Sequence, residues 1–186
     1  MTTEPVFTPL PEGKFTCVLA DPPWQYSADI NRKLDDKKLG RSDKHFRCLP
    51  TESIRNLPVK SVLAKDAFLF LWTTASFLPD ALVVMERWGF AYRSYAPWVK
   101  VLSNGEPRMG LGGYWRNCSE LILLGRRGKP KVISHKVLGV IHAGVGRLAQ
   151  KPAQIYDMIE SLCEGPRLEL FARNSRPGWS SWGNEL

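Results

Sequence analysis

Short runs made mostly of apolar residues are the feature that most limits what this chain can fold into. They occur at residues 15–20, 67–72, 120–124 and 168–172. Runs of this length indicate strands buried on both faces, as in parallel sheets. Amphipathic segments at 77–88 and 152–163 come between them, and Gly89 and Gly165 end these segments. Strands alternating with helices predict an α/β fold, with a mostly parallel sheet covered on both faces.

Weaker patterns complete the expected order of elements. Thr51 is a candidate N-cap for a short helix, and Pro97 interrupts an extended apolar stretch. The additional expected elements are a helix at 51–57, a strand pair or long bent strand at 91–102, a glycine-rich loop at 103–113, and a strand, turn and strand at 131–142.

Length and charge limit the class of protein. The 186 residues predict one domain, spanning 1–186, with a core of its own. A formal net charge of +8 favours a polyanionic partner, although a mildly basic housekeeping enzyme would share it. The polar segment 25–48 carries many Lys and Arg residues, so we expect a mobile substrate loop rather than a merely solvated one.

The cysteines and histidines favour neither a metal site nor a disulfide framework. None of the four cysteines forms a C-x-x-C pair, which fits a reducing cytosol. The three histidines lack metal-ligand spacing, so we expect no metal. No apolar run approaches the ~18–20 residues of a membrane span, and no signal peptide is evident. We therefore expect a cytoplasmic protein with no membrane partner.

A carboxylate, two prolines and an indole directly follow the first apolar run, as Asp21-Pro22-Pro23-Trp24. In an α/β sheet this point is the carboxyl end of a strand, where ligands bind. Asp21 can accept a hydrogen bond from the exocyclic amine of a flat base, and the Pro22 carbonyl can accept another. Trp24 offers a stacking face. The alternative is a strand-to-loop exit with Trp24 in the core.

A second polar group lies in the last forty residues. Its members are Lys151, Glu169, Arg173, Asn174, Asn184 and Glu185. Lys151 precedes an expected helix and suits an anionic group such as a carboxylate. The acidic residues and asparagines near a strand's carboxyl end suit ribose hydroxyls and a purine edge. Singly, each residue is as well explained by a surface salt bridge or a turn.

These blocks together resemble the DPPW adenine-N6 methyltransferases, which use S-adenosylmethionine. This family includes the catalytic subunit of the eukaryotic messenger-RNA adenosine methylase and many bacterial and phage DNA methylases. The matching blocks are Asp21-Pro22-Pro23-Trp24, Gly113-Tyr114-Trp115-Arg116, 120–125, Lys151-Pro152, 155–160, 168–173 and 179–185. The resemblance implies a Rossmann-like methyltransferase fold with permuted motif order. The catalytic motif comes first in the chain. The cofactor strand is expected to be the last strand and to lie beside the catalytic strand in the sheet.

The resemblance also implies a role for individual residues. The catalytic set is Asp21, Pro22, Pro23 and Trp24. The set that binds S-adenosylmethionine is Asp21, Lys151, Glu169, Phe171, Arg173, Asn174, Asn184 and Glu185, with Lys151 on the methionine carboxylate. The set that contacts the substrate is Trp24, Tyr26, Tyr114, Trp115, Arg116, Lys44 and Arg47. Further candidates for phosphate contacts are Lys100, Arg108, Arg126 and Arg127.

The expected activity is methyl transfer to the 6-amino group of adenine in DNA, by a monomer or dimer of the bacterial or phage branch. RNA is the alternative substrate. Two further alternatives are methylation of a small molecule or a protein glutamine amide, and a non-catalytic subunit that binds nucleic acid. The intact Asp21 motif argues against the non-catalytic subunit.

Overall fold

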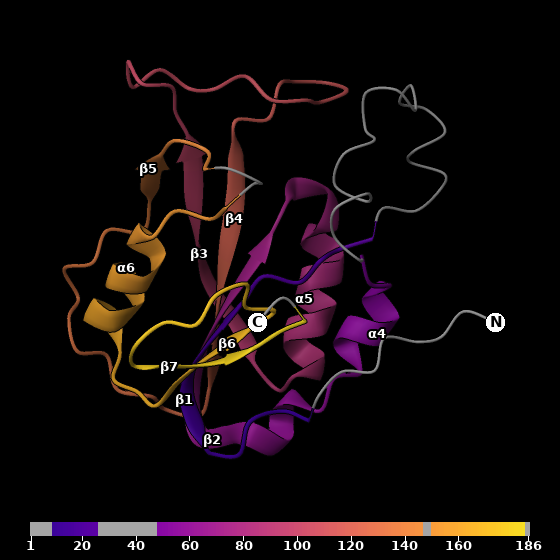
Figure 1. Ribbon diagram of the computed structural model, residues 1–186, viewed down its shortest axis with the longest axis vertical. Helices are drawn as coiled ribbons and strands as arrows, with labels where there is room; N and C mark the ends of the chain where they lie inside the picture. Colours follow the sequence, from indigo (N-terminus) through magenta and orange to yellow (C-terminus); the bar gives the residue numbers. More distant parts are fainter. Residues whose placement is uncertain (1–8, 26–47, 147–149, 185–186) are drawn as a thin grey trace.

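A twisted sheet runs through the centre of the molecule (Figure 1), in a computed structural model that describes residues 9–25, 48–146 and 150–184. The described strands are ordered β5-β3-β4-β2-β1-β6-β7. Their bounds are β1 Phe15–Ala20, β2 Leu63–Thr73, β3 Ala91–Lys100, β4 Ser119–Arg127, β5 Ile141–Ala143, β6 Arg167–Leu170 and β7 Trp179–Trp182. Every neighbouring pair is parallel except the two pairs that involve β4. The mostly parallel α/β fold expected from the sequence is confirmed.

The register brings the ends of the central strands to one edge. Ala20 at the end of β1 is opposite Leu71 of β2 on one side and Leu170 of β6 on the other. β1 and β6 are adjacent, as the resemblance implied for the catalytic and cofactor strands. Because β4 is antiparallel, its first residues lie at the edge where its neighbours end. This carboxyl edge therefore collects residues from β1, β2, β3, β4 and β6.

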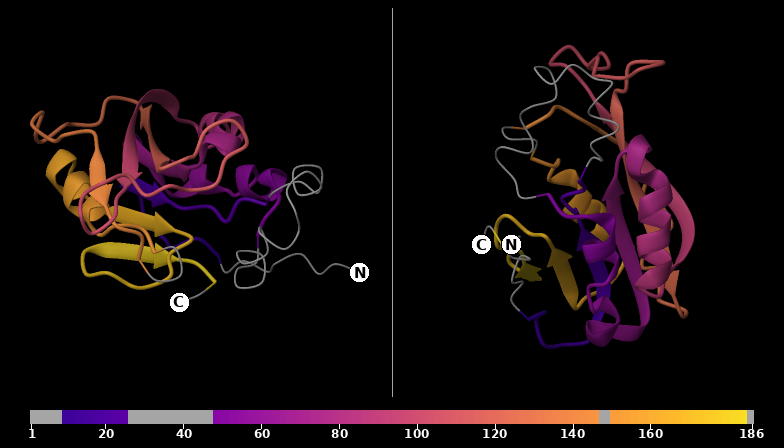
Figure 2. Two further views of the ribbon diagram at one scale, coloured as in Figure 1. Left: turned by 90° about the horizontal axis from the view of Figure 1, so that it is seen from above. Right: turned by 90° about the vertical axis from the view of Figure 1, so that its right-hand side faces the viewer.

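Helices cover both faces of the sheet (Figure 2). Their bounds are α4 Thr51–Arg55, α5 Leu78–Arg87 and α6 Gln154–Leu162, and the short 3₁₀ turns are η1 Val59–Val62 and η2 Ala75–Phe77. Leu69 and Leu71 of β2 pack in a core with α4 and α5. The alternate residues Phe70 and Trp72 pack on the opposite face with α6. The apolar run in β2 is continuous because both of its faces are buried.

The amphipathic pattern of α5 explains its position. Ala81, Val84 and Met85 are buried, at the spacing of one helical face. Trp88 follows the helix and is fully buried, with its indole N–H donating to the Ile54 carbonyl at 3.2 Å. Gly89 then adopts a positive φ of 87°, which a glycine reaches without strain and which ends the helix. Among the described helices, none has the length and apolar character needed to cross a membrane.

Two sequence-based expectations are wrong. The segment 131–142 contains only β5, because Ile133 uses its N–H to bond the Leu162 carbonyl at 2.8 Å rather than a strand. The cofactor strand β6 is not the last strand, because β7 follows and pairs with it in parallel. The two serines between Trp179 and Trp182 hide the apolar pattern that would have indicated β7. The expected loop 25–48 lies almost entirely outside the described residues.

Candidate active site

Asp21 and Lys151 form an ion pair at the carboxyl edge of the sheet. Asp21 directly follows β1, and its backbone N–H donates to the Leu170 carbonyl at 3.4 Å. The Lys151 Nζ lies 2.9 Å from each carboxylate oxygen of Asp21. The side chain of Lys151 is 21% exposed and that of Asp21 is 25% exposed. The pair is therefore partly shielded from water but open to a ligand. The two residues that the sequence linked to catalysis and to a cofactor carboxylate therefore lie in direct contact.

Glu120 is a second carboxylate on the same lysine. Its Oε2 lies 3.4 Å from Lys151 Nζ, and its Oε1 accepts a hydrogen bond from Lys100 Nζ at 2.6 Å. Glu120 is the second residue of β4, and the antiparallel direction of β4 brings it to this edge. It was not among the site residues expected from the sequence. The one available signal was a charged residue at the start of an otherwise apolar strand.

Two buried tryptophans lie beneath the two ammonium groups. Lys151 Nζ lies 5.2 Å from the centroid of the Trp72 ring, and Lys100 Nζ lies 5.0 Å from that of Trp98. The two indoles pack edge to face, with centroids 5.9 Å apart. Such contacts attract a cation to the ring face by about 0.5–2 kcal/mol. The indoles therefore provide a fixed surface for both lysines.

The charges in this cluster stabilise one another. Burial by itself would lower the pKa of Lys151, but Asp21 and Glu120 raise it above its ordinary value. Burial by itself would raise the pKa of Glu120, but Lys151 and Lys100 bring it below its ordinary value. At neutral pH, Lys151 is therefore protonated and Glu120 is ionised.

Glu169 and Tyr156 form a second polar pair on the floor of the site. The Tyr156 hydroxyl donates to Glu169 Oε1 at 2.9 Å. Burial raises the pKa of Glu169, and the hydrogen bond from Tyr156 offsets only part of that effect. Among the described residues, nothing donates a hydrogen bond to its buried Oε2. This oxygen is therefore a ready acceptor for a hydroxyl or amino group of a ligand.

A cleft of about 320 Å³ lies beside these groups, and Asp21, Lys151 and Glu169 are among the residues that line it. That volume lies in the range of small-molecule sites, roughly 300–1,000 Å³. Six of the expected cofactor residues line it, namely Asp21, Lys151, Glu169, Phe171, Arg173 and Asn174. Arg176 also lines it, and so do Tyr156 and Trp72, two residues to which the sequence had assigned no role. The structure thus brings together residues that are up to 155 positions apart in the sequence.

The backbone at the end of β6 is unusual. Phe171 has a φ of 62°, a left-handed conformation that is rare for a bulky residue. Its ring packs edge to face on Trp182, with centroids 5.5 Å apart. Such conformations persist only where the surroundings impose them, and they cluster at functional sites. The turn directs the chain from β6 into 173–177, which forms one wall of the cleft.

Asn184 lies apart from the residues described as lining the cleft. It is exposed, two residues beyond the end of β7. Gly183 precedes it at a tight crossing, where a Cβ would lie 2.2 Å from the Ala172 carbonyl oxygen. The other expected residues, Glu185, Tyr26, Lys44 and Arg47, lie outside the described part of the chain.

Trp24 lies in the core rather than at an open stacking face. It is 8% exposed, its ring stacks on Phe77 with centroids 5.6 Å apart, and its indole N–H donates to the Trp72 carbonyl at 3.2 Å. The prediction of an open base platform at Trp24 is therefore corrected in favour of the alternative. The Pro22 carbonyl already accepts a hydrogen bond from the backbone N–H of Trp24 at 2.9 Å. The second lone pair of this carbonyl oxygen remains as an acceptor for a ligand.

Tyr114 and Trp115 lie in the loop of residues 101–118 between β3 and β4. Tyr114 is fully exposed and Trp115 is 80% exposed. The backbone of this loop folds closely on itself, since a Cβ on Gly112 would lie 1.9 Å from the Trp115 carbonyl oxygen. Because β3 ends and β4 begins at the carboxyl edge, the loop extends from the same edge as the cleft (Figure 1). Arg116 is also exposed in it.

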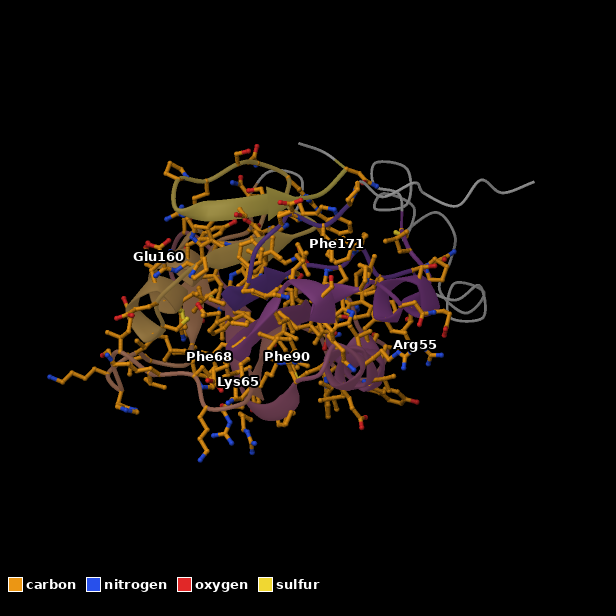
Figure 3. All side chains as sticks on the ribbon, turned by 90° about the horizontal axis from the view of Figure 1, so that it is seen from below. Arg55, Lys65, Phe68, Phe90, Glu160 and Phe171 are labelled. Atoms are coloured by element: carbon orange, nitrogen blue, oxygen red, sulfur yellow. The ribbon has the colours of Figure 1, made fainter. Side chains whose placement is uncertain are left out.

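Arg126 and Arg127 lie at the opposite edge. They pair with Phe68 and Ala67, near the beginning of β2. Arg126 lies six positions after Glu120 along β4, which corresponds to roughly 20 Å. Figure 3 views the molecule from below and labels Lys65, from the same end of β2. The suggestion that these two arginines contact phosphates stays a prediction, and such contacts would lie far from the cleft.

The fold is consistent with that of a methyltransferase: the described residues form a seven-stranded α/β sheet, with an acidic residue after β1 and a cleft at its carboxyl edge. Residues 15–185 match the model of the MT-A70 family. This chain therefore belongs to the MT-A70 family. Several proteins similar to this chain are named as N6-adenosine methyltransferases.

Similar proteins come from bacteria, animals and plants. Type II methyltransferase M.MunI of a Mycoplasma species is 29% identical over 199 residues, covering 97% of this chain and 82% of that protein. The human N(6)-adenosine-methyltransferase catalytic subunit METTL3 is 37% identical over 180 residues, covering 94% of this chain and 28% of METTL3. A putative MT-A70-like N(6)-adenosine-methyltransferase of Medicago truncatula is 34% identical, and this chain spans 27% of it.

Proposed function

We propose that this protein transfers a methyl group from S-adenosylmethionine to the 6-amino group of adenine in DNA. The observation that carries the proposal is the position of Asp21. It directly follows β1 at the carboxyl edge, in contact with Lys151, and lines a cleft shared with Glu169, Arg173 and Asn174. A carboxylate at this place can hold an amine against a ligand that fills the cleft.

The cleft fits S-adenosylmethionine in charge and in hydrogen-bonding capacity. Lys151 supplies a cation for the carboxylate of the methionine part. The buried Oε2 of Glu169, which accepts no hydrogen bond from the described residues, suits a donor such as a ribose hydroxyl or the ammonium group. Arg173 and Asn174 would lie near the ribose. When bound, the cofactor supplies an electrophilic methyl group on a sulfonium.

Asp21 and Pro22 would activate the adenine amine. The lone pair of that amine is delocalised into the ring, so the planar nitrogen is a poor nucleophile. N–H hydrogen bonds to the Asp21 carboxylate and to the remaining lone pair of the Pro22 carbonyl favour a pyramidal nitrogen with an available lone pair. Most of the rate gain would then come from positioning and electrostatics rather than from proton transfer.

The loop at 101–118 is the better candidate for base stacking, because Trp24 is buried. Tyr114 and Trp115 are exposed, and Arg108 and Arg116 flank them. Aromatic side chains stack on bases with about 1–3 kcal/mol per base, and arginines contact phosphates. In a duplex the adenine would be flipped out, at a cost of a few kcal/mol.

One observation favours DNA over RNA. The alignment with M.MunI runs through 82% of that protein, whereas the alignment with METTL3 covers 28% of it. The net charge of +8 fits either nucleic acid. RNA therefore remains the second candidate, favoured by the 37% identity to METTL3.

The test is transfer of labelled methyl from S-adenosylmethionine to double-stranded DNA, single-stranded DNA, RNA and free adenosine, with mass identification of the digested nucleosides. We expect N6-methyladenine in DNA. Asp21→Ala provides the control, and it should bind the cofactor but transfer nothing. Methylation confined to RNA would establish the second candidate. Tight cofactor binding with no transfer to any nucleic acid would contradict both.

A further inference from the structure

Four charged side chains of alternating sign form a continuous row across the carboxyl edge. Lys100 contacts Glu120 at 2.6 Å, Glu120 contacts Lys151 at 3.4 Å, and Lys151 contacts Asp21 at 2.9 Å. Lys100 ends β3, Glu120 lies in β4, Asp21 follows β1, and Lys151 precedes α6. The row carries no net charge. Because each member comes from a different segment, the fold as a whole determines its geometry.

Lys151 is the member of the row that has two anionic partners. Both oxygens of Asp21 accept hydrogen bonds from its ammonium, and Glu120 contacts it from the other side. The ring of Trp72 lies beneath it. In this arrangement both Asp21 oxygens accept from Lys151, so fewer of their lone pairs remain for a substrate amine. A shift of the ammonium away from Asp21 would leave the whole carboxylate to the amine.

Glu120 makes such a shift favourable. A partly buried ammonium that lost its only counter-ion would lose several kcal/mol of stabilisation. Lys151 keeps a carboxylate partner when it moves from Asp21 toward an anionic ligand in the cleft. Glu120 in turn stays in place because Lys100, seated over Trp98, holds its other oxygen.

We propose that Glu120, anchored by Lys100, is a positioning residue that holds Lys151 so that its ammonium can leave Asp21 for the carboxylate of a ligand. This inference rests on the proposed function, because it takes that ligand to be S-adenosylmethionine. Binding of the cofactor would then release both Asp21 oxygens to the amine, so that the catalytic carboxylate accepts hydrogen bonds best in the loaded enzyme.

The first test needs no ligand. Lysine-selective NMR of the intact protein follows the titration of Lys151, assigned with Lys151→Arg, in the wild type and in Glu120→Gln. Loss of the Glu120 charge should lower the pKa of Lys151, whereas Glu120→Asp should largely keep it. An unchanged pKa in a folded Glu120→Gln protein would overturn the proposal.

The second test compares two ligands by calorimetry. S-adenosylhomocysteine carries the amino-acid carboxylate, and 5′-methylthioadenosine lacks it. Glu120→Gln should weaken the binding of S-adenosylhomocysteine by about tenfold, as expected for loss of a charge-assisted contact. It should weaken the binding of 5′-methylthioadenosine by less than twofold. In a Lys151→Met background, Glu120→Gln should have no further effect. Equal weakening of both ligands would show a merely structural role and overturn the proposal.

The two tests also separate this inference from the proposed function. If the wild type binds neither nucleoside, the proposed cofactor is wrong, and the NMR titration still decides whether Glu120 controls Lys151. If both nucleosides bind and Lys151 titrates identically in the wild type and Glu120→Gln, the proposed function stands and the row has no positioning role.

Discussion

The cleft and the 101–118 loop extend from the same edge of the sheet but are built in opposite ways. In the cleft, charged groups are paired before any ligand arrives, as Asp21 is with Lys151 and Tyr156 with Glu169. In the loop, Tyr114 and Trp115 are exposed on a backbone that folds closely on itself. The difference fits the proposed division, with a preorganised site for a small molecule in the cleft and a contact surface for a large partner in the loop.

The strongest test of this division is Asp21→Asn. The amide keeps the size of the side chain but cannot hold the amine as a carboxylate does, so methyl transfer should fall by about 1,000-fold or more. Binding to DNA should change by less than about twofold, because the loop is untouched. Initial rates and fluorescence anisotropy measure the two effects. Nearly unchanged turnover in the folded variant would rule out Asp21 as the catalytic group.

Alanine substitutions of Trp24 and Trp115 should separate the stability of the fold from the binding of DNA. Trp24→Ala removes a buried indole, so the free energy of unfolding should fall by about 3–5 kcal/mol. Trp115→Ala removes an exposed indole and should change it by less than about 0.5 kcal/mol. The same Trp115→Ala should weaken DNA binding by about tenfold. Urea unfolding and anisotropy test this, and a strongly destabilised Trp115→Ala would contradict the assignment of the loop to recognition.

Lys151→Met should weaken cofactor binding by about tenfold while DNA binding is maintained, because the ligand carboxylate loses its cation. The matched control is Lys131→Met, which removes an exposed lysine remote in sequence from the cleft residues. Calorimetry with S-adenosylhomocysteine measures both. Equal affinities for the two variants would remove Lys151 from the cofactor site.

The smallest expected effect concerns pH. Because burial raises the pKa of Glu169, the folded protein favours its protonated form, and the stability due to this group is lost as pH rises through that pKa. Glu169→Gln resembles the protonated form, so it should raise the Tm above that of the wild type at pH 7.5, by no more than about 4 °C. The difference should vanish near pH 4. A lower Tm for Glu169→Gln at pH 7.5 would contradict this sign.

The sequence predicted the position of Asp21, because an acidic residue directly after an apolar run marks the carboxyl end of a buried strand. It could not decide the orientation of Trp24, since that depends on Phe77 and on the Trp72 carbonyl, about fifty residues away. Glu120 was missed for a similar reason. Its importance depends on β4 being antiparallel, and no local pattern shows strand direction.

The base of the 101–118 loop has a further consequence. Its two ends are joined by a backbone hydrogen bond from the Lys100 N–H to the Cys118 carbonyl, and the Arg108 N–H inside the loop donates to the Lys100 carbonyl, each at 2.7 Å. The part of the loop beyond these hydrogen bonds can be longer, shorter or different in composition while β3 and β4 keep their register. The hairpin is therefore a natural graft point. If the loop contacts nucleic acid as proposed, exchanging it between homologues would change the target preference and leave the residues of the cleft unchanged.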